Sequence, residues 1–474
     1  MKLDVLRPRE DMDLPARLAD SAEAADGVKV TLKQFDTWFA QRRRANDFEM
    51  VRIPFSELDG WSFAEDTGNL SHKSGGFFSV EGLRVLSWTG PVREWHQPII
   101  NQAETGMLGI VIKEFDGVLH CLMQAKMEPG NPNLVQLAPT VQATRSNYTR
   151  LHRGSPVRYL DYFVGPRRGN VIVDVLQSEH GSWFFRKKNR NMVVEVTEDV
   201  PLHPDFCWLT FGQIYELMKR NNVINMDART VLSCVPPAKV RVSPSADAFQ
   251  QALVASRDRM AGALHTSAEV MSWFSTQRSL AELEISRMPL KDVPHWHRTD
   301  KEIARADGKY FSVVAVSVTA ANREVTSWTQ PLFEPRGTGL VVFVLKNFGG
   351  VLHVLVNARV EGGFIDSVEL GPTVQCIPWN YDDYEGADRP YLLDYVQTID
   401  PKWIRYEAVH SEEGGRFLNA ESRYLIVEAD DRLPYDIPDD YNWLTIGQLT
   451  DLLRHGHYVN VQARTLVACL KAIS

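Results

Sequence analysis

The amino-acid sequence predicts an α+β protein built as a tandem duplication. The stretch from Gly117 to Tyr148 opens as an apolar strand, turns through EPGNPN and returns as a second strand. A diverged copy runs from Gly350 to Tyr381, and 350 − 117 and 381 − 148 both give an offset of 233 residues. Strand-like runs alternate with helices that begin at capping-box spacings, such as Thr210 and Gln213.

Further segments repeat in the same order. RMPLKDVPHW matches RIPFSELDGW, GKYFSV matches GGFFSV, VHSEEGGRF matches LQSEHGSWF, and WLTIGQL matches WLTFGQI. Unrelated α+β domains would not keep so many matches in order and at nearly constant spacing. The repeats therefore indicate duplication.

The length of 474 residues fits two domains better than one. Residues 1–29 are rich in charge, Ala and Asp, and we expect a mobile tail there. We predict a first repeat over 30–235 and a second, more diverged repeat over 263–474. Residues 236–262 begin with two prolines and are expected to form a linker and a connecting helix.

The composition excludes several classes of protein. A net charge of −8 argues against a general nucleic-acid binder, which needs a basic face. The five cysteines form no CxxC pair, so we expect reduced thiols in the cytoplasm. The N-terminal residues lack the apolar core of a signal peptide, and no run approaches the ~20 apolar residues of a membrane span.

Polar residues that differ between the two copies are the better candidates for chemistry, because shared identities are explained by the common fold. Lys126 stands opposite Arg359, and Arg145 opposite Pro378. The first repeat has the richer polar set. We therefore expect two related cavities, of which the first is the working one.

Lys126 and Glu128 share one face of their strand, because side chains alternate with a period of two. The pair fits a catalytic site and a structural ion pair equally well. For Tyr148 the alternatives are a pocket residue and a buried tyrosine. For Glu179 they are a pocket residue and a residue at the end of a strand.

Several catalytic motifs are absent from the sequence. There is no GxGxxG, P-loop, GxSxG or HExxH. HWH at 295–297 and HGH at 455–457 each offer two histidines without a third ligand, so surface or core histidines are favoured over a metal site.

Four long strings carry a resemblance to the NDP-hexose 2,3-dehydratases of deoxysugar biosynthesis. They are LSHKSGGFFSV, QAETGMLG, QAKMEPGNPNLVQLAPTVQATRSNY and LQSEHGSWFFRKKNRN. The resemblance covers about residues 30–472. It implies two Nudix-like halves, each a mixed sheet flanked by helices, in a homodimer that acts in antibiotic deoxysugar biosynthesis. It also implies removal of the carbon 2 hydroxyl of dTDP-4-keto-6-deoxyglucose, leaving a ketone at carbon 3.

The residue types fit this reaction. Proton removal beside a ketone needs a base and donors at the ketone oxygen, and hydroxyl loss needs an acid. We place the chemistry on Lys126, Glu128, Tyr148 and Glu179. We assign substrate binding to Trp61, His72, Lys73, Ser74, Gln142, Thr144, Arg145, Asn147, His180, Lys187, Arg190 and Asn191. The counterpart pocket of the second repeat is assigned to Arg359, Glu361, Tyr381 and Arg423.

The sequence leaves more than one assignment possible for the roles of these residues. Lys126 would hold the ketone oxygen, Tyr148 would be the acid, and Glu179 or Glu128 the base. The enol product tautomerises without redox chemistry, so no nicotinamide is required, and because neither half shows the Nudix metal-binding box, no metal is expected either.

We expect functional coupling to an NADPH-dependent 3-ketoreductase. Two competing functions remain at this point. One is a Nudix-type NDP-sugar hydrolase, whose metal-binding box neither half shows. The other is a non-catalytic sugar-nucleotide-binding subunit of a ketoreductase.

Overall fold

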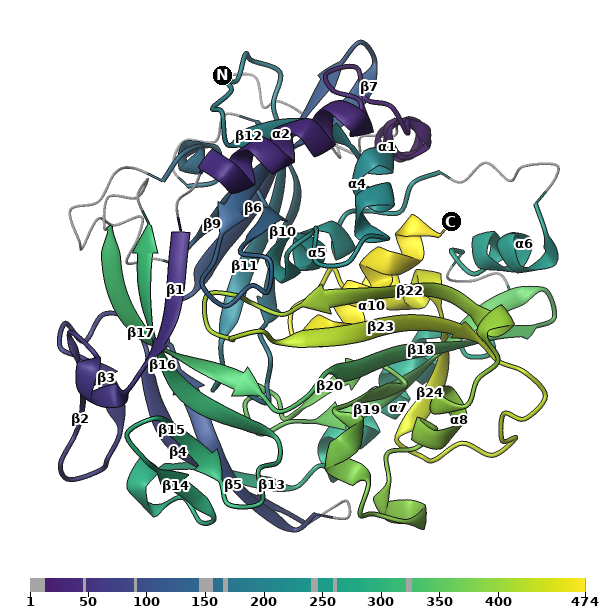
Figure 1. The fold of residues 1–474 in the computed structure, drawn as a ribbon. Helices are drawn as coiled ribbons and strands as arrows, with labels where there is room; N and C mark the ends of the chain where they lie inside the picture. The colour runs from purple at the N-terminus through teal and green to yellow at the C-terminus, as the bar shows by residue number, and fades with distance from the viewer. Residues whose placement is uncertain are drawn as a thin grey trace, which may run out of the picture.

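The duplication is visible in a computed structural model, which describes residues 13–45, 48–88, 92–144, 157–164, 169–239, 246–258, 262–320 and 326–473 (Figure 1). Its strands form two seven-stranded and two five-stranded sheets, with helices between and around them. The predicted α+β class and the repeated halves are confirmed.

The first seven-stranded sheet has the order β10-β11-β6-β7-β12, with β8 paired to β7 and β9 to β6. The sheet is mixed, because β11 runs parallel to β6 while the other pairs are antiparallel. Its strands are β6 (Gly106–Phe115), β7 (Val118–Met127), β8 (Val135–Ala138), β9 (Val141–Ala143), β10 (Asn170–Ser178), β11 (Lys188–Glu195) and β12 (Phe206–Thr210). The predicted hairpin is the β7–β8 pair, in which Lys126 lies opposite Gln136.

The second seven-stranded sheet repeats this topology, with the order β20-β19-β18-β23-β22, β21 paired to β18 and β24 to β19. Strand β18 again runs parallel to β23. Its strands are β18 (Gly339–Phe348), β19 (Val351–Val360), β20 (Val368–Gly371), β21 (Val374–Cys376), β22 (Ile404–Ser411), β23 (Glu421–Glu428) and β24 (Tyr441–Thr445).

The two five-stranded sheets exchange strands between the repeats. Strand β1 (Phe48–Ile53) of the first repeat pairs with β16 (Phe311–Ala320) of the second, and β13 (Leu283–Met288) pairs with β4 (Ser79–Ser87) of the first. The remaining strands are β2 (Trp61–Phe63), β3 (Leu70–His72), β5 (Glu94–Asn101), β14 (Trp296–Arg298), β15 (Glu302–Arg305) and β17 (Ser327–Pro335). The repeats are therefore intertwined, which the sequence did not predict.

Helices α5 (Met226–Ser233) and α10 (Val461–Ala472) pack against each other at the centre of the molecule. Each carries a fully buried arginine that binds the other repeat. Arg229 Nη2 donates to the Ser411 carbonyl at 2.7 Å, and Arg464 Nη2 donates to the Ser178 carbonyl at 2.5 Å. These shared residues therefore serve the fold, as expected.

The predicted capping boxes open their helices. They precede α2 (Leu32–Ala45), α4 (Phe211–Met218) and α7 (Ser267–Leu280). In each, the capping side chain accepts a hydrogen bond from an amide that the helix leaves unpaired. Further helices among the described residues are α6 (Ala248–Ala255), α8 (Leu393–Gln397) and α9 (Ile446–Leu452).

The predicted mobile tail is wrong for residues 14–23, which form helix α1 (Leu14–Glu23). Leu14 and Leu18 are buried on one helical face, and Ser21 Oγ donates to the Leu119 carbonyl at 2.5 Å. The alanines and charges that suggested a tail are also common in helices, and two leucines are enough to anchor this one. Residues 1–12 lie outside the described residues.

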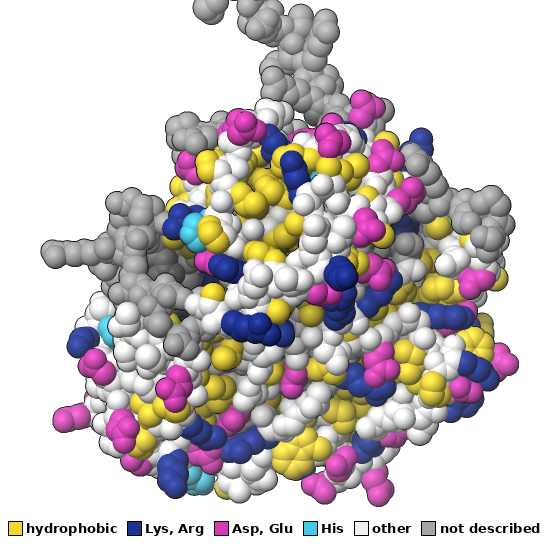
Figure 2. All heavy atoms as spheres, turned by 45° about the horizontal axis from the view of Figure 1, so that its top comes forward, with side chains coloured by type: hydrophobic (Ala, Val, Ile, Leu, Met, Phe, Trp, Pro, Cys, Tyr) yellow, Lys and Arg dark blue, Asp and Glu magenta, His cyan; other side chains and the backbone are white. Residues whose placement is uncertain are grey.

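Basic and acidic side chains are interspersed over the face shown in Figure 2. No helix in the described part of the chain is long and apolar enough to cross a membrane.

Candidate active site

A cavity of about 420 Å³ lies in the second repeat, where the ends of β18, β19 and β21 meet the sheet that contains β16. Three residues predicted for the counterpart pocket line it, namely Arg359, Glu361 and Tyr381. Glu361 Oε1 accepts hydrogen bonds from Arg359 Nε at 2.6 Å and from Gln375 Nε2 at 3.0 Å. Burial lowers the pKa of Arg359, but the charge of Glu361 and its hydrogen bond raise this pKa by more, so the net shift is upward.

The first repeat completes this cavity. The turn between β10 and β11 places His180 and Trp183 in the lining. The two backbones touch at this point, where the Gly363 amide donates to the Gly181 carbonyl at 2.8 Å. The expectation that His180 belongs to the first-repeat site is therefore wrong, because its turn crosses to the other half.

His180 lies between two carboxylates. Its Nε2 is 2.9 Å from Glu412 Oε2, and its Nδ1 is 3.5 Å from Glu179 Oε2. Burial alone would lower the pKa of His180, but Glu179 and Glu412 raise it to about 10. The imidazole is therefore a cation at neutral pH.

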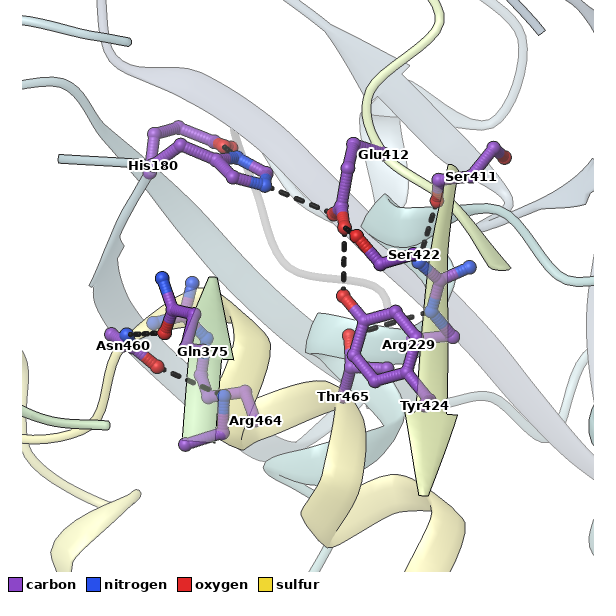
Figure 3. Close-up of polar contacts among 12 residues, drawn as sticks. His180, Arg229, Gln375, Ser411, Glu412, Ser422, Tyr424, Asn460, Arg464 and Thr465 are labelled. Carbon is purple, nitrogen blue, oxygen red and sulfur yellow. Dashed lines mark hydrogen bonds and ion pairs between the residues drawn. The ribbon is translucent and has the colours of Figure 1, made fainter. Parts of the chain in front are cut away.

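The seam between the repeats is a buried polar network (Figure 3). Glu412 Oε1 accepts hydrogen bonds from Ser422 Oγ at 3.0 Å and from Tyr424 at 2.9 Å. Together with His180 Nε2, these donors hold the Glu412 carboxylate in one arrangement. The turns that cross between the repeats are therefore fixed in place.

The structure brings Lys126, Glu128 and Gln142 together at the equivalent position of the first repeat. Glu128 Oε1 accepts a hydrogen bond from Gln142 Nε2 at 2.7 Å. Lys126 Nζ donates to the Gln142 carbonyl at 3.2 Å and lies 3.7 Å from Glu128 Oε1. The predicted same-face pair is confirmed, as an ion pair supported by one amide side chain.

The second repeat also contributes side chains to this first-repeat site. The turn between β22 and β23 carries Glu413 and Arg416, and the Gly130 amide donates to the Gly414 carbonyl at 2.8 Å. The Arg416 guanidinium lies 4.4 Å from the centre of the Phe78 ring, and burial lowers the pKa of Arg416. Sequence reasoning missed both residues, because it assigned the first-repeat site to side chains of the first repeat, and no local pattern shows that this turn crosses from the second.

Buried carboxyl and amino groups surround this spot. Burial and the nearby Glu413, Glu179 and Glu128 raise the pKa of Asp227 well above its usual value. Glu179 Oε1 accepts a hydrogen bond from Asn189 Nδ2 at 2.5 Å. Asp227 was also missed, because it stands beside the Ala-Arg-Thr segment that both repeats share.

The remaining strand residues of this region are also placed. Lys187 Nζ donates to the Glu104 carbonyl, and burial lowers the pKa of Lys187. Asn191 is buried on β11 and donates to the Asn189 carbonyl at 3.2 Å. Thr144 is half-buried just after β9. Arg145, Asn147 and Tyr148 lie outside the described residues.

Trp61 and His72 lie in the small sheet of the first repeat, with ring centres 5.3 Å apart. Their counterparts Trp296 and Arg305 line the second-repeat cavity, so the pair occupies an equivalent position. Ser74 Oγ bonds His72 Nδ1 at 2.8 Å. The side chain of Lys73, which was assigned to substrate binding, is 73% exposed and lies 3.9 Å from Asp59 Oδ1.

Arg190 and Arg423 lie away from the sites to which they were assigned. Arg190 pairs with Asp174 at 2.6 Å, and Arg423 with Glu407 at 2.7 Å, each across two neighbouring strands. Side chains alternate along a strand, so the inward Asn189 and Asn191 direct Arg190 to the outer face. Sequence matching shows that two residues correspond, but not which face they occupy.

Replacing Arg190 or Arg423 separately with Ala is expected to leave kcat and KM near wild type. Partly exposed pairs of this kind contribute only about 0–1 kcal/mol to stability. Steady-state kinetics and a melting curve for each variant test this. A large rise in KM for Arg190→Ala would show that Arg190 does belong to the substrate-binding site.

Comparison with known proteins gives the family. A model of the NDP-hexose 2,3-dehydratase family matches residues 32–235 and again 267–470. A protein of Amycolatopsis orientalis named dTDP-4-dehydro-6-deoxy-alpha-D-glucopyranose 2,3-dehydratase is 53% identical over 475 residues, 99% of this chain and 96% of the relative. A protein of the same name from Saccharopolyspora spinosa is 53% identical, over 96% of this chain and 95% of the relative. Another from Streptomyces violaceoruber is 48% identical, over 93% of this chain and 97% of the relative. The chain belongs to the NDP-hexose 2,3-dehydratase family.

Proposed function

We propose that this chain removes water from dTDP-4-keto-6-deoxyglucose to give the 3,4-diketo-2,6-dideoxy sugar nucleotide. The observation that carries the proposal is the cluster of Lys126 with Glu128, Glu179 and Glu413 in a site of the first repeat. The names and near-complete coverage of the relatives support the same substrate.

The chemistry follows from the ketone at carbon 4, which acidifies the proton on carbon 3. Glu128 or Glu179 takes this proton, and negative charge develops on the ketone oxygen. The ammonium of Lys126 stabilises that charge, as a fixed donor does in an oxyanion hole. Loss of the carbon 2 hydroxyl as water leaves an enol, which becomes the carbon 3 ketone.

We assign catalysis to the first-repeat site and binding of the same ligand class to the second-repeat cavity. Arg359, Arg305 and the protonated His180 give the second cavity cations for a diphosphate. Trp183 and Trp296 offer aromatic faces to a base. The second-repeat cavity has His180 at the position where the first-repeat site has Glu413, so its acid–base chemistry differs.

The finer organisation is also proposed from the family resemblance. We place the repeats at 30–235 and 263–474, joined by 236–262, and relate each to the Nudix fold. We propose a cytoplasmic homodimer in antibiotic deoxysugar biosynthesis. Its unstable diketone product would pass to an NADPH-dependent 3-ketoreductase.

Incubation with dTDP-4-keto-6-deoxyglucose, NADPH and a 3-ketoreductase tests the function. We expect mass spectrometry to show a sugar nucleotide that has lost one water and gained two hydrogens, and we expect chelator-treated protein to remain active. Release of a nucleoside monophosphate, restored by Mg²⁺, would support the hydrolase. Binding without any product would support the non-catalytic subunit.

A further inference from the structure

Two carboxylates from different repeats face one point in the first-repeat site. A Cβ built on Gly415 would lie 3.2 Å from Glu413 Oε1 and 3.7 Å from Glu128 Oε1. Glu413 belongs to the turn after β22 in the second repeat, whereas Glu128 follows β7 in the first. The close contact of Gly130 with Gly414 holds these two segments together.

The two carboxylates have different partners. Glu128 accepts a hydrogen bond from Gln142 and lies near Lys126. No described side chain forms a hydrogen bond or close ion pair with the Glu413 carboxylate. Burial, followed by the charges of Glu179 and Glu128, raises the pKa of Glu413 to about 7. When like charges share a site, the carboxyl group with the fewest donors holds the proton.

The duplication relates Glu413 to a residue that lines a cavity. Its counterpart in the duplication, His180, lines the second-repeat cavity. Glu413 is itself partly exposed, unlike the fully enclosed Glu412 beside it. Arg416 and Lys187 lie close enough to act on its charge, and they offer cations to an anionic substrate.

We propose that Glu413, supplied by the second repeat, is the acid that protonates the departing carbon 2 hydroxyl in the first-repeat site. This inference rests on the proposed function. Glu413 gives its proton to the hydroxyl, the C2–O bond breaks and water leaves. The electrons of the C3–H bond form the C2=C3 double bond as Glu128 takes the carbon 3 proton.

Tautomerisation then restores both groups. The enol hydroxyl returns a proton to Glu413, and Glu128 delivers its proton to carbon 2. The balance is one substrate to one diketone and one water, with no oxidant or reductant. Glu413 takes the role that sequence reasoning gave to Tyr148.

The test measures the pH dependence of kcat for full-length wild type, Glu413→Gln and the charge-matched surface control Glu407→Gln. We expect Glu413→Gln to lower kcat by ~10²–10⁴, the usual contribution of general acid–base catalysis. Wild-type kcat should fall as pH rises through about 7, because the acid must be protonated, and Glu413→Gln should lose this dependence. Glu407→Gln should keep it.

A second variant changes the geometry without changing charge. In Gly415→Ala the added methyl group meets only the ends of the Glu413 and Glu128 side chains, so the fold is expected to survive. Displacing the Glu413 carboxylate should lower kcat by roughly 10–10²-fold. The affinity for dTDP, measured by titration calorimetry, should stay near wild type in both variants.

If Glu413→Gln keeps the kcat and the pH profile of the wild type, and the wild type forms the expected product, this inference is overturned and the proposed function stands. Loss of the same pH dependence in Tyr148→Phe, with Glu413→Gln unaffected, would also overturn it. A wild type that binds dTDP but forms no product would overturn the proposed function and this role together.

Discussion

Replacing Lys126 with Met is expected to lower kcat by ~10²–10³, the usual cost of losing a preorganised donor at a developing negative charge. The substitution keeps the length of the side chain and removes the cation 3.7 Å from Glu128. The matched control is Arg359→Met, which changes the equivalent cation in the second-repeat cavity. It should leave kcat close to wild type. Both variants are compared by steady-state kinetics and by melting temperature.

The opposite outcome leads to an equally definite conclusion. If Lys126 serves only as a structural partner of Glu128, Lys126→Met lowers the melting temperature but leaves kcat per folded molecule intact. If Arg359→Met abolishes turnover and Lys126→Met does not, the second cavity is the catalytic one. The combination of kcat and stability therefore separates the two interpretations that the sequence left open.

Replacing Gly130 with Ala is expected to destabilise the protein by more than about 4 kcal/mol, the range of exceptional single substitutions. A Cβ at this position would lie 1.7 Å from the Phe417 carbonyl oxygen, which belongs to the backbone of the other repeat. Relief of the clash would separate the crossing turns and break two backbone hydrogen bonds, Gly130 to Gly414 and Asn419 to Gly130. At about 2 °C per kcal/mol, the melting temperature should fall by roughly 8 °C or more.

Gly76→Ala is the control for this experiment. The nearest atom to a Cβ on Gly76 is Ser74 Oγ at 3.4 Å, an ordinary contact. Its melting temperature should match that of the wild type. An unchanged melting temperature in Gly130→Ala would show that the turns are not held as closely as the structure indicates.

The features that the sequence predicted well are local. The β7–β8 hairpin and the capping boxes depend on neighbouring residues, and the duplication depends on comparing the chain with itself. Lys126, Glu128 and Gln142 come together because they lie at the end of β7 and on β9, two segments only 14–16 residues apart in the sequence. Short-range patterning is sufficient for such groups.

Two of the missed features depend on contacts between the repeats. His180 and Glu413 exchange sites because their turns cross the seam, and no local pattern records such a crossing. Arg190 was misassigned because conservation between the copies does not tell the inner face of a strand from the outer one. Each error concerns the direction of a side chain or turn, which tertiary packing decides.

The exchange of strands also constrains how this chain is made. Strand β1 pairs Phe48 with Ala320, so its partner is synthesised 320 − 48 = 272 residues later. At the usual ~5–20 residues per second of translation, β1 waits roughly 15–50 s on the ribosome with an open edge. Unpaired edges favour pairing with other chains. Nascent first repeats of neighbouring ribosomes would thus be exposed to one another during this interval.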